Sequence, residues 1–195
     1  MKTLADAWNW YLATRRNLER MARLGSKHWG DPSLEDASIW QDDLFRMLEP
    51  SVIVADTTTS MKPIDDLAVV VIFSVFESNV RDYLAARVKP EAADLSDPIL
   101  KEASADALQG IEEGSFSKRV LQPLKAQGRV SADLVTQVDQ VRDYRNWVAH
   151  GRREIPANNV TPEIARARLT EFLGALGIAA EPEQPESVGS GEAPG

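Results

Sequence analysis

The residues with the clearest chemical potential lie in the segment Arg145-Asn146-Trp147-Val148-Ala149-His150-Gly151. Cleavage of RNA without a metal ion requires a base for the 2′-hydroxyl, an acid for the leaving oxygen and a cation for the phosphorane. Histidine titrates near neutral pH and serves as base or acid, arginine stabilises phosphate charge, and asparagine can orient either side chain. We therefore interpret Arg145, Asn146 and His150 as candidate catalytic residues for RNA cleavage that needs no metal and no cofactor.

These three residues lie at the end of one predicted helix, which starts at the N-cap Ser131 and stops at Gly151. Asn146 and His150 are four residues apart and share a face, whereas Arg145 and His150 are separated by roughly 140° around an ideal helix. Arg145 also falls on the aliphatic stripe of the helix, where a guanidinium is costly unless it is paired or faces a solvated groove. That stripe consists of Leu134, Val138, Val141 and Val148.

Further basic residues flank the segment. Arg142 lies one turn before the motif, and Arg152 and Arg153 follow Gly151 directly. The formal net charge of −8 argues against a protein that coats nucleic acid by bulk electrostatics. A local basic patch suits phosphate binding, so these three arginines are candidate substrate-binding residues. For Arg152 and Arg153 the alternative is a solvated helix end.

The number of histidines bears on the oligomeric state. The chain has only two, and His28 lies in a predicted loop. If base and acid must both be imidazoles, a symmetric dimer that joins two copies of His150 is the most economical arrangement. We therefore expect a homodimer that acts on an RNA substrate.

The pattern Arg145-Asn146-x-x-x-His150, followed by Gly151, resembles the active-site signature of the HEPN superfamily. The resemblance covers about residues 60–175. It implies a bundle of four or five helices, a composite cleft between two protomers, and an endoribonuclease acting as a toxin or host-defence effector. The segment Phe73–Leu84 resembles the family's central helix, which often carries an acidic residue facing the site, and this makes Glu77 a supporting candidate.

Each candidate also has a plain structural interpretation. His150 can interact with the last carbonyl groups of its helix, and Asn146 can pack or cap. Arg145 can form a salt bridge with Glu77 or Asp143. Glu77 lies four residues before Arg81 and can form an ordinary intrahelical pair. Trp147 is a supporting candidate that could line an RNA groove, whereas core or dimer packing is favoured for Trp8, Trp10, Trp29 and Trp40.

Helical periodicity predicts an all-α, single-domain bundle that occupies residues 1–178. Its core covers about 60–176 and follows an N-terminal helical extension over about 2–48. We expect helices over 2–24 (stopping at Gly25), 31–49 and 63–90, with a polar turn over 51–62. A short helix over 98–108, a loop marked by Gly110 and Gly114, and a helix ending near Gly128 lead to the motif helix. A last helix begins after Thr161-Pro162-Glu163, and the acidic Pro, Gly and Ser tail 179–195 is expected to be disordered.

Composition narrows the setting and leaves competing functions open. The chain has no cysteine and no apolar run of the ~18 residues that a membrane span needs, so we expect a cytoplasmic protein without membrane contact. The alternative to a ribonuclease is a catalytically silent HEPN-like module that binds a nucleotide, RNA or a protein. A third possibility is an antitoxin-like regulatory protein whose acidic tail binds a partner, and an antitoxin or regulatory partner is also conceivable for the enzyme.

Overall fold

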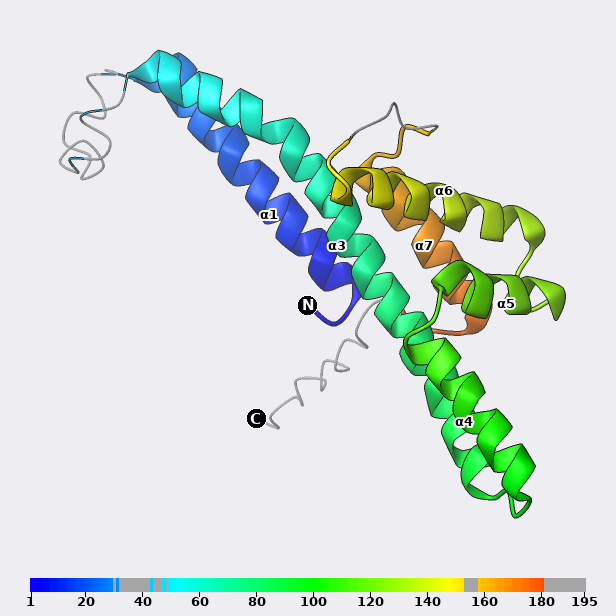
Figure 1. Cartoon of the computed structure of the whole chain (residues 1–195). Coiled ribbons are helices and arrows are strands. Elements are labelled where there is room, and N and C mark those ends of the chain that lie inside the picture. Colours follow the sequence, from blue (N-terminus) through cyan, green and yellow to red (C-terminus); the bar gives the residue numbers. More distant parts are fainter. Residues whose placement is uncertain (30, 32–42, 44–46, 48, 153–157, 181–195) are drawn as a thin grey trace, which may run out of the picture.

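Helix α3 (Pro50–Ala93) is the element against which the rest of the computed structural model packs. The structure describes residues 1–29, 31, 43, 47, 49–152 and 158–180, and within these ranges every regular element is helical. With 44 residues, α3 is roughly 66 Å long. Figure 1 shows it running through the whole molecule with the other helices along its flanks. The predicted all-α fold is confirmed.

Helix α1 (Leu4–Arg23) runs antiparallel to the first half of α3 (Figure 1). Its start is fixed by a capping box, in which Thr3 Oγ1 accepts from the Asp6 amide and the Asp6 carboxylate accepts from the Thr3 amide. Leu4, Ala7 and Tyr11 are buried in the common core. The helix predicted over 2–24 is therefore confirmed, and a π-helical turn (Leu24–His28) containing the predicted stop Gly25 follows it.

The predicted polar turn over 51–62 is wrong, because α3 begins at Pro50 and passes through this segment without a break. The hydroxyls of Thr57 and Thr58 donate to the carbonyls of Ile53 and Val54, so these polar side chains are satisfied inside the helix. Ile53 and Thr57 are buried. Packing of α1 against this stretch outweighs the weak helix propensity of its threonines and of Pro63, which lies inside the helix.

The second half of α3 contacts helix α4 (Pro98–Glu112), whose start is capped by Asp97. The predicted short helix over 98–108 is present but extends to Glu112, so Gly110 is helical and the prediction of a loop at this residue is wrong. A π-helical turn, η4 (Phe116–Leu121), and helix α5 (Gln122–Ala126) then lead to the motif helix.

Helices α6 (Ala132–Ala149) and α7 (Pro162–Leu176) cover the middle of α3, as Figure 1 shows. Ser131 Oγ accepts from the Leu134 amide, so the predicted start of α6 is confirmed. Thr161 Oγ1 accepts from the Ile164 amide, and this cap starts α7 at Pro162, two residues earlier than predicted. Phe76 of α3 lies at the centre of the core, with edge-on ring contacts to Phe116 and Phe172. This core holds α6 at a fixed place along α3.

Several sequence predictions concern residues outside the described ranges. They are most of the helix predicted over 31–49, Trp40, Arg153 and all but the first residues of the tail predicted over 179–195. Within the ranges that are described, no helix combines the length and apolarity needed to cross a membrane.

Candidate functional site

A polar groove of about 470 Å³ lies between the middle of α3, the start of η4 and the second half of α6. It brings together four of the predicted site residues, Glu77, Arg142, Arg145 and Asn146. Basic residues outnumber acidic ones among its lining side chains, although the whole chain has a net charge of −8. The lining also contains Phe73, Arg81, Gly114, Ser115, Phe116, Ser117 and Lys118.

Arg145 is the central cation of this groove. Its guanidinium carbon lies 5.7 Å from the centroid of the Phe73 ring, and its Nη1 donates to Asn146 Oδ1 at 3.0 Å. Its Nε is shielded from solvent and has no hydrogen-bond partner within the described ranges. No carboxylate of a described residue forms a salt bridge with Arg145, so the predicted alternative of an ion pair with Glu77 or Asp143 is not observed.

Arg142 faces the same groove but is already neutralised. Its Nη1 lies 2.8 Å from Asp139 Oδ1, and its Nη2 donates to Asp143 Oδ1 at 2.9 Å. An arginine between two carboxylates offers less attraction to a phosphate than an unpaired one. Arg145 is therefore a stronger candidate than Arg142 for stabilising the charge of a phosphate, although both arginines line the groove.

Glu77 forms the intrahelical pair with Arg81 that its spacing indicated. Arg81 Nη2 and Nε donate to Glu77 Oε1 at 2.6 Å and 3.0 Å. The same guanidinium donates to the backbone carbonyls of Ile111 and Gly114, which close the turn between α4 and η4. Glu77 thus lines the groove while it holds Arg81 on the turn that forms the opposite wall.

Gly114 allows the chain to fold back closely on the end of α4. A Cβ atom at this position would lie 2.5 Å from the Gly110 carbonyl oxygen and 2.9 Å from Arg119 Cγ. Only glycine fits such a contact without displacement of the backbone. The predicted turn residue is thereby confirmed as the point where the chain leaves α4 and enters the groove wall.

His150 is the C-cap residue of α6 and is exposed. Its amide donates to the Asn146 carbonyl at 2.9 Å, while Gly151 and Arg152 donate to the carbonyls of Val148 and Trp147. This is a Schellman ending, with Gly151 at φ 80° as predicted for a C-terminal glycine. The imidazole makes no hydrogen bond or ion pair with a described residue, and it does not line the groove that contains Arg145.

Arg152 and Trp147 belong to a different cluster from the groove. Arg152 adopts φ 57°, lies 5.8 Å from the Trp147 ring centroid and donates to Asp66 of α3. Trp147 also contacts the ring of Tyr144 at 5.4 Å. Arg152 is therefore fixed by a carboxylate, and the structure separates it from Arg142 and Arg145.

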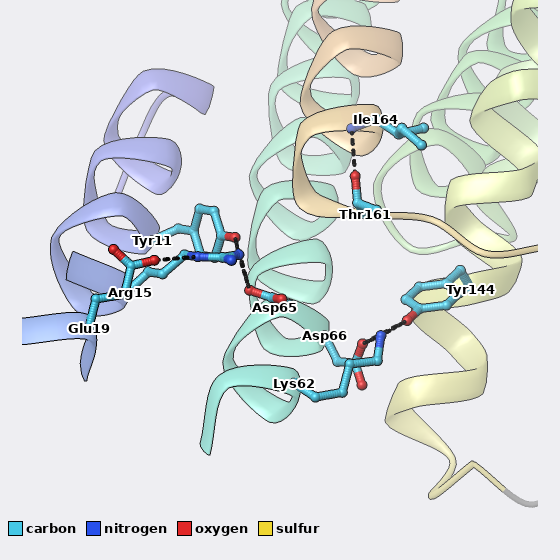
Figure 2. A network of polar contacts seen from close by, with 9 residues as sticks. All are labelled: Tyr11, Arg15, Glu19, Lys62, Asp65, Asp66, Tyr144, Thr161 and Ile164. Carbon is cyan, nitrogen blue, oxygen red and sulfur yellow. Dashed lines mark hydrogen bonds and ion pairs between the residues drawn. The ribbon is translucent and has the colours of Figure 1, made fainter. Parts of the chain in front are cut away.

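Asp66 is the residue that sequence reasoning missed most clearly. Its side chain is only 1% exposed and accepts from Tyr144 Oη at 2.6 Å and from Lys62 Nζ at 2.7 Å (Figure 2). Burial and the hydrogen bond to Asp66 raise the pKa of the Tyr144 phenol. Burial alone would lower the pKa of Lys62, but its hydrogen bonds to Asp66 and Tyr144 raise it overall. This cluster ties the end of α6 to α3.

Within the described ranges, no group of three or more His, Cys, Asp or Glu side chains is arranged to hold a metal ion. Comparison with known proteins yields no match, whether with protein-family models, curated proteins or solved structures.

Proposed function

We propose that this protein is a metal-independent endoribonuclease of the HEPN type, active as a homodimer and serving as a toxin or host-defence effector. The observation that supports it most is the state of Arg145, a guanidinium in a polar groove that has no carboxylate partner among the described residues, at the end of the helix that is capped by the exposed His150. Arg145 is half-buried and its shielded Nε lacks a hydrogen-bond partner among the described residues, so a phosphate ligand would supply the negative charge that this cation lacks.

The proposed reaction is an attack of the 2′-oxygen of a ribose on the adjacent phosphorus. A histidine removes the 2′-hydroxyl proton, the new P–O bond forms, and the bond to the 5′-oxygen breaks as that oxygen receives a proton. The products are a 2′,3′-cyclic phosphate and a 5′-hydroxyl. Arg145 stabilises the charge of the phosphorane, and Asn146 orients Arg145 through its side-chain oxygen.

The position of His150 supports the dimeric form of this proposal. Its exposed ring lies outside the groove of its own protomer, so a second copy is needed to place an imidazole beside each Arg145. The two copies of His150 would then supply the base and the acid. A monomer in solution that cleaves RNA at full rate would contradict this arrangement.

The second candidate is a catalytically silent module that binds RNA, a nucleotide or a protein. The separation of His150 from the groove favours it, because a binding groove needs Arg145 but not the histidine. Expression of the wild type, His150→Ala and the matched control His28→Ala in a bacterial host separates the two. The ribonuclease predicts RNA loss and growth arrest with wild type and His28→Ala only, whereas equal growth and intact RNA in all three would sink it.

A further inference from the structure

Lys118 occupies the wall of the groove that faces α6, and sequence reasoning did not single it out. It belongs to η4, whose start is fixed by the hydrogen bond from its amide to Ser115 Oγ. Its side chain is exposed and makes no ion pair or hydrogen bond with a described residue. Lys118 and Arg145 are therefore two cations of the same groove that have no acidic partner among the residues described, and different elements provide them.

The wall that carries Lys118 is fixed in place. Arg81 donates to the carbonyls of Ile111 and Gly114 immediately before η4, and Glu77 holds Arg81 at the same time. Phe116, in the first turn of η4, is 5% exposed and packs edge-on against Phe73 at 6.0 Å. A preorganised wall of this kind avoids the entropy loss that a mobile loop suffers on binding.

The aromatic rings of the groove are not available to stack on bases. Phe73 is 1% exposed and lies under the Arg145 guanidinium, and the Arg81 guanidinium lies 5.3 Å from the Phe116 ring centroid. The side-chain oxygen of Asn146 is engaged by Arg145. Base recognition in single strands depends on open aromatic faces or free hydrogen-bonding edges, and this groove offers mainly cations and the hydroxyls of Ser115 and Ser117.

We propose that Lys118 binds the phosphate next to the one held by Arg145, so that the groove grips the backbone of single-stranded RNA without reading its bases. The proposal rests on the proposed function for the identity of the ligand and names the contacts of that same site. A volume of about 470 Å³ is enough for a short piece of one strand. Both cations then receive phosphate oxygens as acidic partners.

The test measures binding to single-stranded RNA that carries 2′-O-methyl groups and cannot be cleaved. Labelled strands of roughly ten nucleotides, all-uridine or all-adenosine, are titrated with the full chain over a salt series. The variants are Lys118→Ala and Lys118→Arg, with Lys125→Ala as the matched control, since Lys125 is an exposed lysine of the adjacent helix α5 that does not line the groove. Circular dichroism verifies that each variant is folded.

The expected result is a roughly 3- to 10-fold loss of affinity for Lys118→Ala, equal for both strands, with the slope of log affinity against log salt reduced by about 0.7. Lys118→Arg and Lys125→Ala should bind like the wild type. The inference is overturned if Lys118→Ala binds like the wild type, if only one strand is affected, if a duplex binds equally well, or if the wild type binds neither strand. Lys118-dependent binding without cleavage of ordinary RNA would sustain this inference and refute the enzymatic proposal.

Discussion

Asp65 and Asp66 are neighbours on α3 and hydrogen-bond to helices on opposite sides of it: Asp65 to α1 and Asp66 to α6 (Figure 2). Asp65 Oδ1 accepts from Tyr11 Oη and from Arg15 Nη1 of α1, both at 2.9 Å. Asp66 accepts from Tyr144 of α6 and from Arg152 just beyond it. One turn of α3 therefore fixes both the N-terminal helix and the end of the helix that carries His150.

Replacement of Tyr144 by phenylalanine tests the contact between Asp66 and α6. The change removes the hydrogen bond to the buried Asp66 carboxylate, and we expect the free energy of unfolding to fall by about 2 kcal/mol in urea titrations. Tyr83→Phe is the matched control, because Tyr83 Oη donates to the neutral Leu176 carbonyl and its loss should cost only about 1 kcal/mol. Equal costs for the two changes would show that Asp66 does not depend on Tyr144.

The contact between Asp65 and α1 predicts that the stability of the protein depends on pH in the alkaline range. Burial raises the pKa of Tyr11 to about 12, with Arg15 opposing and Asp65 adding to the effect. The folded state binds the phenol proton of Tyr11 more tightly than the unfolded chain does. The contribution of Tyr11 to the free energy of unfolding is therefore fully present below pH ~10 and is lost as pH rises to ~12. The stability advantage of wild type over Tyr11→Phe, from urea unfolding, should therefore shrink by about 2 kcal/mol across this range. An advantage that stays constant with pH would contradict this linkage.

Variants of Glu77 and Arg81 show whether Glu77 positions the groove wall or takes part in catalysis. Arg81→Ala leaves Glu77 unpaired and two carbonyls without a donor, so we expect a loss of roughly 2–4 kcal/mol in unfolding free energy. Glu77→Gln keeps an acceptor for Arg81 and should retain RNA cleavage within about tenfold of wild type. A loss of about 100-fold or more in Glu77→Gln, without loss of stability, would instead assign Glu77 a proton-transfer role.

Local chemistry in the sequence was sufficient to predict the helices that position the site. The cap Ser131 and the C-terminal Gly151 act within a few residues of themselves, so their signals do not depend on the rest of the fold. The uninterrupted apolar stretch of α3 has the same property. The segment 51–62 does not, because its helical state depends on packing against α1, which is distant in the sequence.

The candidate site also has a part that the local sequence predicted and a part that depends on residues distant in the sequence. The placement of Arg145 on the aliphatic stripe indicated either an ion pair or a solvated groove, and the structure has a groove beside it. The opposite wall was not predictable, since Lys118 reaches the groove only through the turn at Gly114, which Arg81 of α3 holds in place. Asp66 was missed because its partner Tyr144 is far away in the sequence; a carboxylate just before a fully apolar run was the only signal.

The central claim is that His150 performs the proton transfers of RNA cleavage. The direct measurement incubates purified wild type, His150→Ala and His28→Ala with a labelled single-stranded RNA in the presence of a metal chelator, and follows the products with time. We predict a 2′,3′-cyclic phosphate product from wild type and His28→Ala, and a rate about 100- to 10,000-fold lower for His150→Ala. Cleavage by His150→Ala at the wild-type rate, or no cleavage by the wild type, would contradict the claim.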